Sequence, residues 1–172
     1  MNINIFLSFI ISILLVLFFM FKPMDITIKH FKDVPLFELT DFTMYELTPN
    51  GLETIMLGSR GVRYSDRYVV KDMDYTDNSK KYIANIVADL GIYKNEIVTV
   101  TGHVVYRRED GLTFKSQKAT YNKKTADVIS DTNYIAYLND NVVTGDFIKY
   151  NNITKKIYSK NVVAKYQLKK EK

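Results

Sequence analysis

The sequence predicts an all-β fold, an open and twisted jelly-roll-like sandwich that follows one N-terminal transmembrane helix. Three observations predict it. Residues 93–130 contain segments rich in Val, Ile, Thr and Tyr separated by turn residues, which is typical of strands joined by short hairpins. A similar unit recurs after about 29 residues, as expected for stacked hairpins that bury one continuous face. The chain begins with an apolar run of membrane-helix length.

The apolar run covers residues 5–21 and is interrupted only by Ser8 and Ser12, which a helix tolerates. A helix rises about 1.5 Å per residue, so this run nearly crosses a hydrocarbon core of about 30 Å. A cleaved signal peptide is the alternative interpretation, but no basic residue precedes the run and no small-x-small site follows it. We therefore expect an uncleaved transmembrane anchor over residues 1–22.

Pro23 ends this helix, because proline cannot continue the helical hydrogen-bond ladder. Residues 23–35 then have the mixed composition of a linker. The β-domain is expected over residues 36–168, with its first strand over residues 36–46. Residues 169–172 are expected to be a frayed tail.

Three segments of the β-domain allow more than one structural interpretation. Residues 71–81 are polar and predict a loop or hairpin tip. Residues 82–90 carry apolar side chains at helical spacing, but the repeat requires a strand there, and a strand is the prediction. Two sets of side chains alternate over residues 54–59, and the sequence leaves open which of them faces the interior. The final strands are expected over residues 142–148 and 157–168.

The repeat is visible in particular residues. The segment Tyr121–Thr125 (YNKKT) reappears as Tyr150–Thr154 (YNNIT). Chance could produce one such match in a chain with 13 tyrosines. Four tyrosines in register favour a true repeat, and they are Tyr64, Tyr93, Tyr121 and Tyr150.

The residues that carry chemistry are sparse. The chain has no cysteine, and its two histidines, His30 and His103, lack carboxylates at metal-ligand spacing. Residues 72–78 resemble a calcium loop but lack its glycine, so a solvated tip is the better interpretation. No nucleophile, phosphate-loop or dinucleotide motif occurs. We therefore expect no metal, no cofactor and no enzymatic activity.

Two segments of the repeat together resemble a known family. Val98–Val104 ends in Gly-x-Val, and Asp110–Tyr121 opens with Asp-Gly and ends in small-x-Tyr. In this order they resemble the lipopolysaccharide-bridge β-domain family, which includes the soluble bridge protein LptA, the N-terminal domain of LptD and the membrane-anchored LptC. Upstream, Tyr45–Gly51 followed by Val62–Tyr64 is similar to the opening hairpin of the membrane-anchored branch, the LptC family. The resemblance covers about residues 38–168.

The resemblance implies a non-enzymatic component that binds lipopolysaccharide and links an inner-membrane ABC transporter to the periplasmic bridge protein LptA. It also implies a single-pass protein of the cell inner membrane with its C-terminal domain in the periplasm. The charges favour the opposite orientation, with the C-terminal domain in the cytoplasm, because Lys22, Lys29 and Lys32 follow the span and no Lys or Arg precedes it. We follow the resemblance on this point.

Two other functions remain open at this stage. A membrane-anchored β scaffold would organise envelope partners without carrying lipid, and its interior would be filled. An anchored envelope enzyme would show clustered polar groups with shifted pKa values in a cleft. Basic pairs at residues 107–108, 123–124 and 155–156 are expected in turns, where they favour solubility or attract an anionic lipid or membrane surface. Nucleic acid is not an expected partner.

The candidate site has three parts. Lipid is expected to contact inward-facing strand positions, for which the candidates are Ile55, Leu57, Val98, Val100, Phe114, Tyr121, Tyr137, Phe147 and Val162. Gly51 and Gly145 resemble glycines of the family at a turn and beside the slot, with a positive φ expected at Gly51. The docking edge for a partner strand is expected at Val162, Val163 and Ala164, because no later residues pair with that strand.

Overall fold

The structure, a computed structural model, describes residues 3–20, 33–49 and 51–167 and divides into two compact units, Met1–Phe31 and Lys32–Lys172. The first unit contains the helix α1, Ile3–Met20. Over the residues that the structure describes, no helix reaches the length and hydropathy of a membrane span. Most of the expected linker and the whole expected tail lie outside the described residues.

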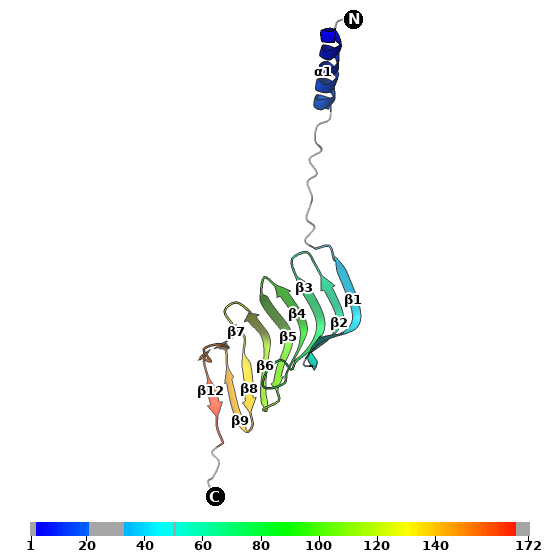
Figure 1. The fold of residues 1–172 in the computed structure, drawn as a ribbon. Coiled ribbons are helices and arrows are strands. Elements are labelled where there is room, and N and C mark those ends of the chain that lie inside the picture. The colour runs from blue at the N-terminus through cyan, green and yellow to red at the C-terminus, as the bar shows by residue number, and fades with distance from the viewer. Residues whose placement is uncertain (1–2, 21–32, 50, 168–172) are drawn as a thin grey trace. The chain divides into compact units, whose positions relative to one another are not determined.

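The second unit is a single antiparallel sheet of twelve strands (Figure 1). Its strands are β1 (Phe37–Thr48), β2 (Gly51–Arg63), β3 (Tyr68–Asp77), β4 (Ala84–Lys94), β5 (Ile97–Arg108), β6 (Leu112–Asn122), β7 (Asp127–Ser130), β8 (Tyr134–Leu138), β9 (Asn141–Gly145), β10 (Phe147–Asn151), β11 (Ile157–Lys160) and β12 (Val163–Lys165).

The first six strands are long and follow one another in the sheet, and the sheet then forks. One half of β6 pairs with β7, which continues to β10 and β11, while the other half pairs with β8, which continues to β9 and β12. Each of these short strands is therefore half of a long strand that is broken in its middle. We call the half of the sheet with β7, β10 and β11 arm 1, and the half with β8, β9 and β12 arm 2.

A bend separates the two arms in the long strands as well. The register of β4 with β5 and of β5 with β6 shifts at this line, which marks bulges. Four non-glycine residues along the line have a positive φ, namely Asp41, Asp72, His103 and Asn161. Such short polar side chains tolerate the left-handed region better than other residues do.

Polar side chains of neighbouring strands contact one another along the bend. The Ser59 hydroxyl donates to Asp72, and the Asn161 amide donates to Asp146. His103 Nδ1 lies 2.8 Å from an Asp89 carboxylate oxygen. These contacts hold the bulged backbone in place where the regular strand ladder is interrupted.

The hydrophobic core lies on the inner side of the bend. Its buried members are Met73, Ala88, Val100, Val104 and Ala119, and the partly buried members packed on them are Val70, Tyr75, Ile86 and Val98. We call the sheet face that carries these side chains the inner face. Small residues are needed there, because a Cβ at Gly91 would lie only 2.5 Å from the Met73 sulfur.

The fold confirms some of the expected strands and corrects others. A strand over residues 82–90 is confirmed in its essentials, since β4 begins at Ala84. The loop or hairpin tip expected over residues 71–81 is confirmed only for residues 78–81, which connect β3 to β4. It was wrong for residues 71–77, because β3 continues through Asp77 with Asp72 at the bend and Asp74 on the outer face. The all-β class is confirmed, but the sandwich is one bent sheet, and the bend divides the last two predicted strands.

Candidate functional site

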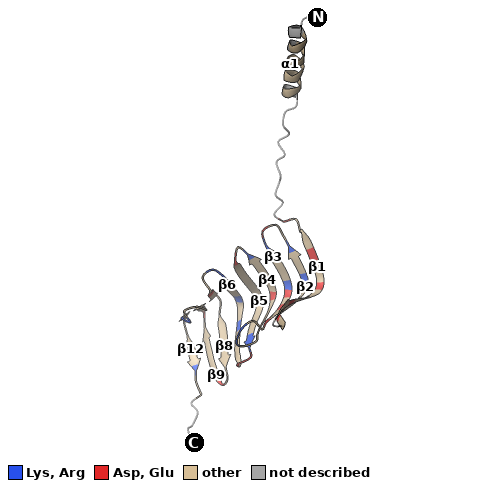
Figure 2. Ribbon diagram, viewed as in Figure 1, with Lys and Arg blue, Asp and Glu red and all other residues tan. Residues whose placement is uncertain are grey.

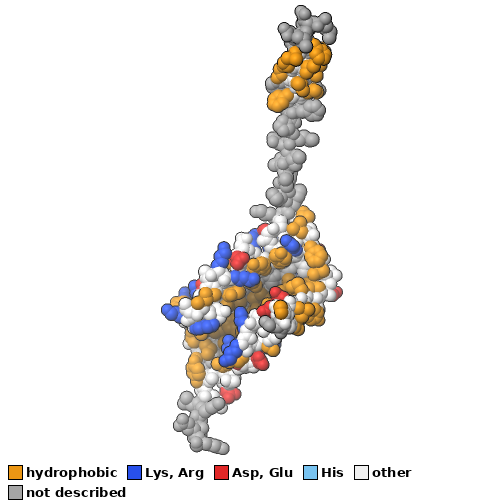
Figure 3. All heavy atoms as spheres, in the orientation of Figure 1, with side chains coloured by type: hydrophobic (Ala, Val, Ile, Leu, Met, Phe, Trp, Pro, Cys, Tyr) orange, Lys and Arg blue, Asp and Glu red, His pale blue; other side chains and the backbone are white. Residues whose placement is uncertain are grey.

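The inner faces of the two arms form the walls of a groove. Figure 3 shows a hollow between the arms in which hydrophobic side chains gather, with Lys and Arg side chains at its borders. Within the described residues, β1 pairs only with β2, and the last strands β11 and β12 pair only with β10 and β9. The sheet is therefore open at both ends.

Arm 1 contributes a row of tyrosines to the inner face near its tip. Directly opposed residues on neighbouring strands share a face, and the register links Tyr68 to Tyr93, Tyr93 to Val98, Val98 to Tyr121 and, through Val128, to Tyr150. Three of the four repeated tyrosines thus lie in one row. Tyr64 lies after β2, outside the row, and Tyr68 takes its place.

Arm 2 contributes a second apolar row. The register aligns Met44, Met56, Tyr75, Ile86, Tyr106, Phe114, Ala136, Val143 and Ala164 on the inner face. Burial raises the pKa of the Tyr75 and Tyr106 phenols. The Asp77 carboxylate adds to the rise at Tyr75, and the Arg108 guanidinium opposes it in part at Tyr106. These phenols stay neutral at physiological pH, so the wall is uncharged at both positions.

A contact between the arms narrows the C-terminal end of the groove. Tyr134 of arm 2 is buried, stacks on Phe114 at 5.5 Å between ring centroids, and hydrogen-bonds through its hydroxyl to Ser159 of arm 1 at 2.8 Å. A Cβ at Gly145 would lie 2.8 Å from both the Tyr134 ring and the Lys160 carbonyl oxygen. Gly145 therefore permits a close approach of the β11 backbone.

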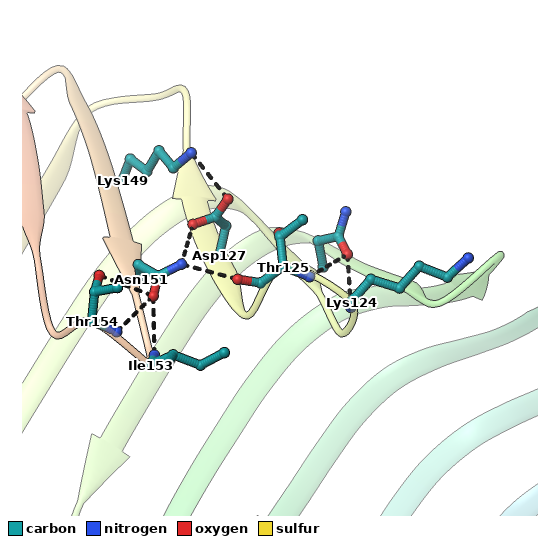
Figure 4. A network of polar contacts seen from close by, with 8 residues as sticks. Lys124, Thr125, Asp127, Lys149, Asn151, Ile153 and Thr154 are labelled. Carbon is teal, nitrogen blue, oxygen red and sulfur yellow. Dashed lines mark hydrogen bonds and ion pairs between the residues drawn. The ribbon is translucent and has the colours of Figure 1, made fainter.

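The repeated Tyr-Asn sequences end in matching turns at the tip of arm 1 (Figure 4). Asn122 Oδ1 accepts hydrogen bonds from the backbone N–H groups of Lys124 and Thr125. Asn151 Oδ1 accepts them from Ile153 and Thr154 in the same way. The repeat thus specifies an inner-face tyrosine followed by an asparagine that closes the turn.

Neighbouring turns are also joined to one another. Asn151 Nδ2 donates to the Thr125 carbonyl at 2.9 Å and to Asp127 at 2.8 Å, and Lys149 pairs with Asp127 at 3.0 Å. The Asn151 amide and the Lys149 ammonium together lower the pKa of Asp127. The backbone N–H of Lys123 donates to the backbone carbonyl of Glu96, which joins the preceding turn to the stack.

The structure brings together four of the nine candidate lipid contacts. Val98, Val100, Phe114 and Tyr121 lie on the inner face. The register places four others on the opposite, outer face, namely Ile55, Leu57, Tyr137 and Phe147, so the inward parity expected of them was wrong. Val162 lies exposed between β11 and β12.

The physical reason is that both faces of arm 2 carry apolar side chains. Met56 and Gly58 face inward, opposite the set that contains Ile55 and Leu57. The missed wall residues include Met56, Val70, Tyr75, Ile86, Tyr106, Val143 and Ile148. One signal could have found the inner parity, since a glycine within an apolar strand marks close packing on its own face.

The remaining candidates lie at a turn and at an edge. Gly51 opens β2 with φ +116°, which confirms the positive φ expected after Pro49. Val163 and Ala164 belong to β12, and all three residues of that strand are exposed. Their open edge makes them available to a further strand, as the edge of β1 is at the other end.

Charges of both signs are spread over the sheet and its turns (Figure 2). The expectation that all three basic pairs lie in turns was wrong for Arg107 and Arg108, which end β5. Arg108 forms a two-point contact with Asp110 that lowers the pKa of this carboxyl. The described residues contain no group of His, Asp and Glu side chains suited to holding a metal ion.

Comparison with known proteins shows a solved structure that is similar to this architecture. The crystal structure of LptH, the LptA homologous periplasmic component of the lipopolysaccharide transport device from Pseudomonas aeruginosa, is similar with a TM-score of 0.52 and 13% sequence identity. The similarity covers 80% of this chain and 98% of LptH. No curated protein sequence matches the chain.

The bent open sheet and its apolar groove thus define a β-domain protein of the LptH-like fold. Residues 5–167 match the family described as lipopolysaccharide-assembly, LptC-related. The chain belongs to this LptC-related family, as the resemblance of its strand segments indicated.

Proposed function

We propose that the protein is a lipopolysaccharide carrier that holds acyl chains in its groove and passes the lipid onward without covalent chemistry. The observation that carries this proposal is the inner face itself, which is apolar on both arms and belongs to a sheet with unpaired edges at both ends. Each CH₂ group removed from water contributes about 0.8 kcal/mol, so several acyl chains bind such a surface strongly.

The first strand supports entry of lipid at the N-terminal end. Its inner-face side chains Phe37, Leu39 and Met44 are 57%, 37% and 53% exposed. These side chains expose apolar surface next to the open edge of β1, where a lipid arriving from a neighbouring protein would meet them first. Apolar surface of this kind marks interaction sites in soluble domains.

The proposal includes an inner-membrane anchor and a periplasmic β-domain. Support comes from the family and from the apolar run over residues 5–21, most of which lies in α1. In this arrangement an inner-membrane ABC transporter delivers the lipid at the β1 end. The open edge of β12 receives a strand of the periplasmic bridge protein, so that its sheet continues this one.

Photo-crosslinking in cells tests the carrier function, and the chain offers matched pairs of positions. Photoreactive residues at Met56 and Tyr121 face the groove, whereas those at Leu57 and Tyr137 occupy the outer face of similar strands. We expect lipopolysaccharide to be captured from the first pair and not from the second. Equal capture from both faces, or capture from neither, would refute the carrier and leave the anchored scaffold as the better function.

A further inference from the structure

Two cations and two tyrosines form a continuous row near the tip of arm 1. We call the border of the groove at the tip of each arm the mouth of that arm. The Arg63 guanidinium carbon lies 5.4 Å from the centre of the Tyr68 ring, and the Tyr68 and Tyr93 ring centroids are 6.1 Å apart. The Lys123 ammonium lies 4.7 Å from the centre of the Tyr93 ring. Arg63 and both tyrosines belong to the inner-face row nearest the tip of arm 1.

Two other lysines near the tip of arm 1 are paired with carboxylates. Lys94 is paired with Asp66 at 2.6 Å and Lys149 with Asp127 at 3.0 Å. Within the residues that the structure describes, Arg63 and Lys123 form no ion pair, and their side chains are directed over tyrosine rings instead. Their positive charge is therefore available to an external anion.

The mouth of arm 2 has a different character. Its inner-face row includes Glu46, Thr54 and Asp77 in register. The one arginine in that row, Arg108, is held by Asp110 at 2.6 Å. The side chains at the mouth of arm 1 therefore carry positive charge. Those at the mouth of arm 2 near β1 to β3 carry negative charge.

We propose that Arg63 and Lys123 form a subsite for the phosphate groups of the lipid headgroup, which orients the lipid across the groove. This inference rests on the proposed carrier function. A phosphate monoester accepts charge-assisted hydrogen bonds from guanidinium and ammonium groups, while the faces of Tyr68 and Tyr93 pack against sugar rings. The headgroup then lies at the mouth of arm 1, and the acyl chains lie against the aliphatic and aromatic row of arm 2.

Further lysines lie on the same edge and strengthen the local field. Lys124 lies in the same turn as Lys123, and the turn that leads to Lys155 and Lys156 is stacked beside it through the backbone hydrogen bond from Asn152 to the Ala126 carbonyl. Exposed charges of this kind act over about 10 Å at moderate ionic strength. Added salt should therefore weaken binding of a phosphorylated lipid more than that of an uncharged one.

Binding of two lipid A preparations to the full chain in uncharged detergent tests the subsite. The double variant Arg63→Gln, Lys123→Gln should bind bis-phosphorylated lipid A about tenfold more weakly and dephosphorylated lipid A unchanged. The matched control is Lys115→Gln, Lys160→Gln, which removes two cations from over Tyr137 and Phe147 on the outer face. The control should bind both lipids as the unmodified chain does.

The possible outcomes separate the subsite from the groove. Equal binding of both lipids by the double variant and the unmodified chain would overturn the subsite and leave the carrier function intact. Failure of the unmodified chain to bind either lipid would overturn both. Phosphatidylglycerol vesicles form a third arm, and an equal loss of vesicle binding in the double variant would assign the cations to a membrane surface instead. Competition of inorganic phosphate with lipid A at low millimolar concentration would assign them to free phosphate and also overturn the proposal.

Discussion

At the scale of single residues, the asparagine that follows each repeated tyrosine has a defined task. Asn151 satisfies two backbone N–H groups of its own turn and reaches across to Thr125 and Asp127 on the neighbouring turn. A side chain with this many partners cannot be replaced without leaving polar groups unpaired. The repeat in the sequence is therefore a repeat of turn chemistry as much as of strand pattern.

Replacing Asn151 with alanine should lower the free energy of unfolding by about 1–3 kcal/mol, because the hydrogen bonds within and between the turns are lost. Urea unfolding of the full chain in detergent measures this loss. Asn152→Ala is the matched control, since within the described residues the Asn152 side chain hydrogen-bonds only to the exposed Lys155 ammonium. Its effect should stay within about 0.5 kcal/mol. Equal effects of the two variants would contradict the role of Asn151.

The lowered pKa of Asp127 predicts how the stability of the folded protein depends on pH. Its pKa is lowered in the folded protein by Asn151 and Lys149, so its contribution is complete above the ordinary carboxyl pKa. That contribution is lost as the pH falls from about 4 through the lowered folded pKa. Urea midpoints between pH 7 and pH 3 should therefore decline less steeply at the acid end for Asp127→Asn. Parallel curves for the two proteins would show that Asp127 is not linked to folding.

Gly145 illustrates how tightly the two arms approach each other. Gly145→Ala places a methyl group against the Tyr134 ring and the Lys160 carbonyl, and one of these must shift. We expect a loss of about 1–3 kcal/mol in the free energy of unfolding, which is typical of overpacking. An unchanged urea midpoint would mean that β11 moves away from Gly145 without cost.

At the scale of elements, the last strand carries the partner-binding prediction. Successive residues of a strand direct their N–H groups to opposite sides, so one of Val163 and Ala164 donates to β9 and the other faces the open edge. A proline at the residue whose N–H faces the open edge should leave the domain folded and abolish pull-down of the periplasmic bridge protein. A proline at the residue whose N–H donates to β9 should disturb β12 itself.

Prolines at Thr43 and Met44 provide the control, because these residues lie on β1 at the opposite edge. They should leave the pull-down unchanged. Loss of the bridge protein with the β1 prolines, and retention with both β12 prolines, would reverse the assignment of the two edges.

At the scale of the whole molecule, the sheet is a stack of bent strands in which each layer contacts its neighbours. Such architectures tolerate the loss of one repeat if the register is kept. Val87 of β4 and Lys115 of β6 are both register partners of Val105, so the two strands occupy equivalent places. A shortened sheet can therefore be built by joining one strand to the other.

Deletion of residues 87–114 joins Ile86 to Lys115 and keeps inner and outer positions in phase. We expect this chain to unfold cooperatively at a lower urea midpoint than the full chain. Deletion of residues 87–113 instead moves Phe114 to the outer parity and should prevent cooperative unfolding, because a one-residue slip exchanges the faces of a strand. Similar transitions for both deletions would show that the layers do not depend on register.

The sequence by itself determined much of this architecture, because strand propensity, hairpin turns and the tyrosine repeat are local properties. Gly51 at positive φ and Asn122 and Asn151 closing matching turns follow from their neighbours in the chain. The open C-terminal edge also followed from the order of the strands.

The inner face was decided only by the tertiary structure, for two physical reasons. Both faces of arm 2 are apolar, so alternation could not choose between Met56 and Leu57. The bend then changes the parity within a strand, since Phe114 and Ala119 of β6 both face inward. Counting from one half of a bent strand therefore fails in the other half. Residues as distant as Arg63 and Lys123 lie at one groove mouth only because β2 to β6 are consecutive neighbours in the sheet.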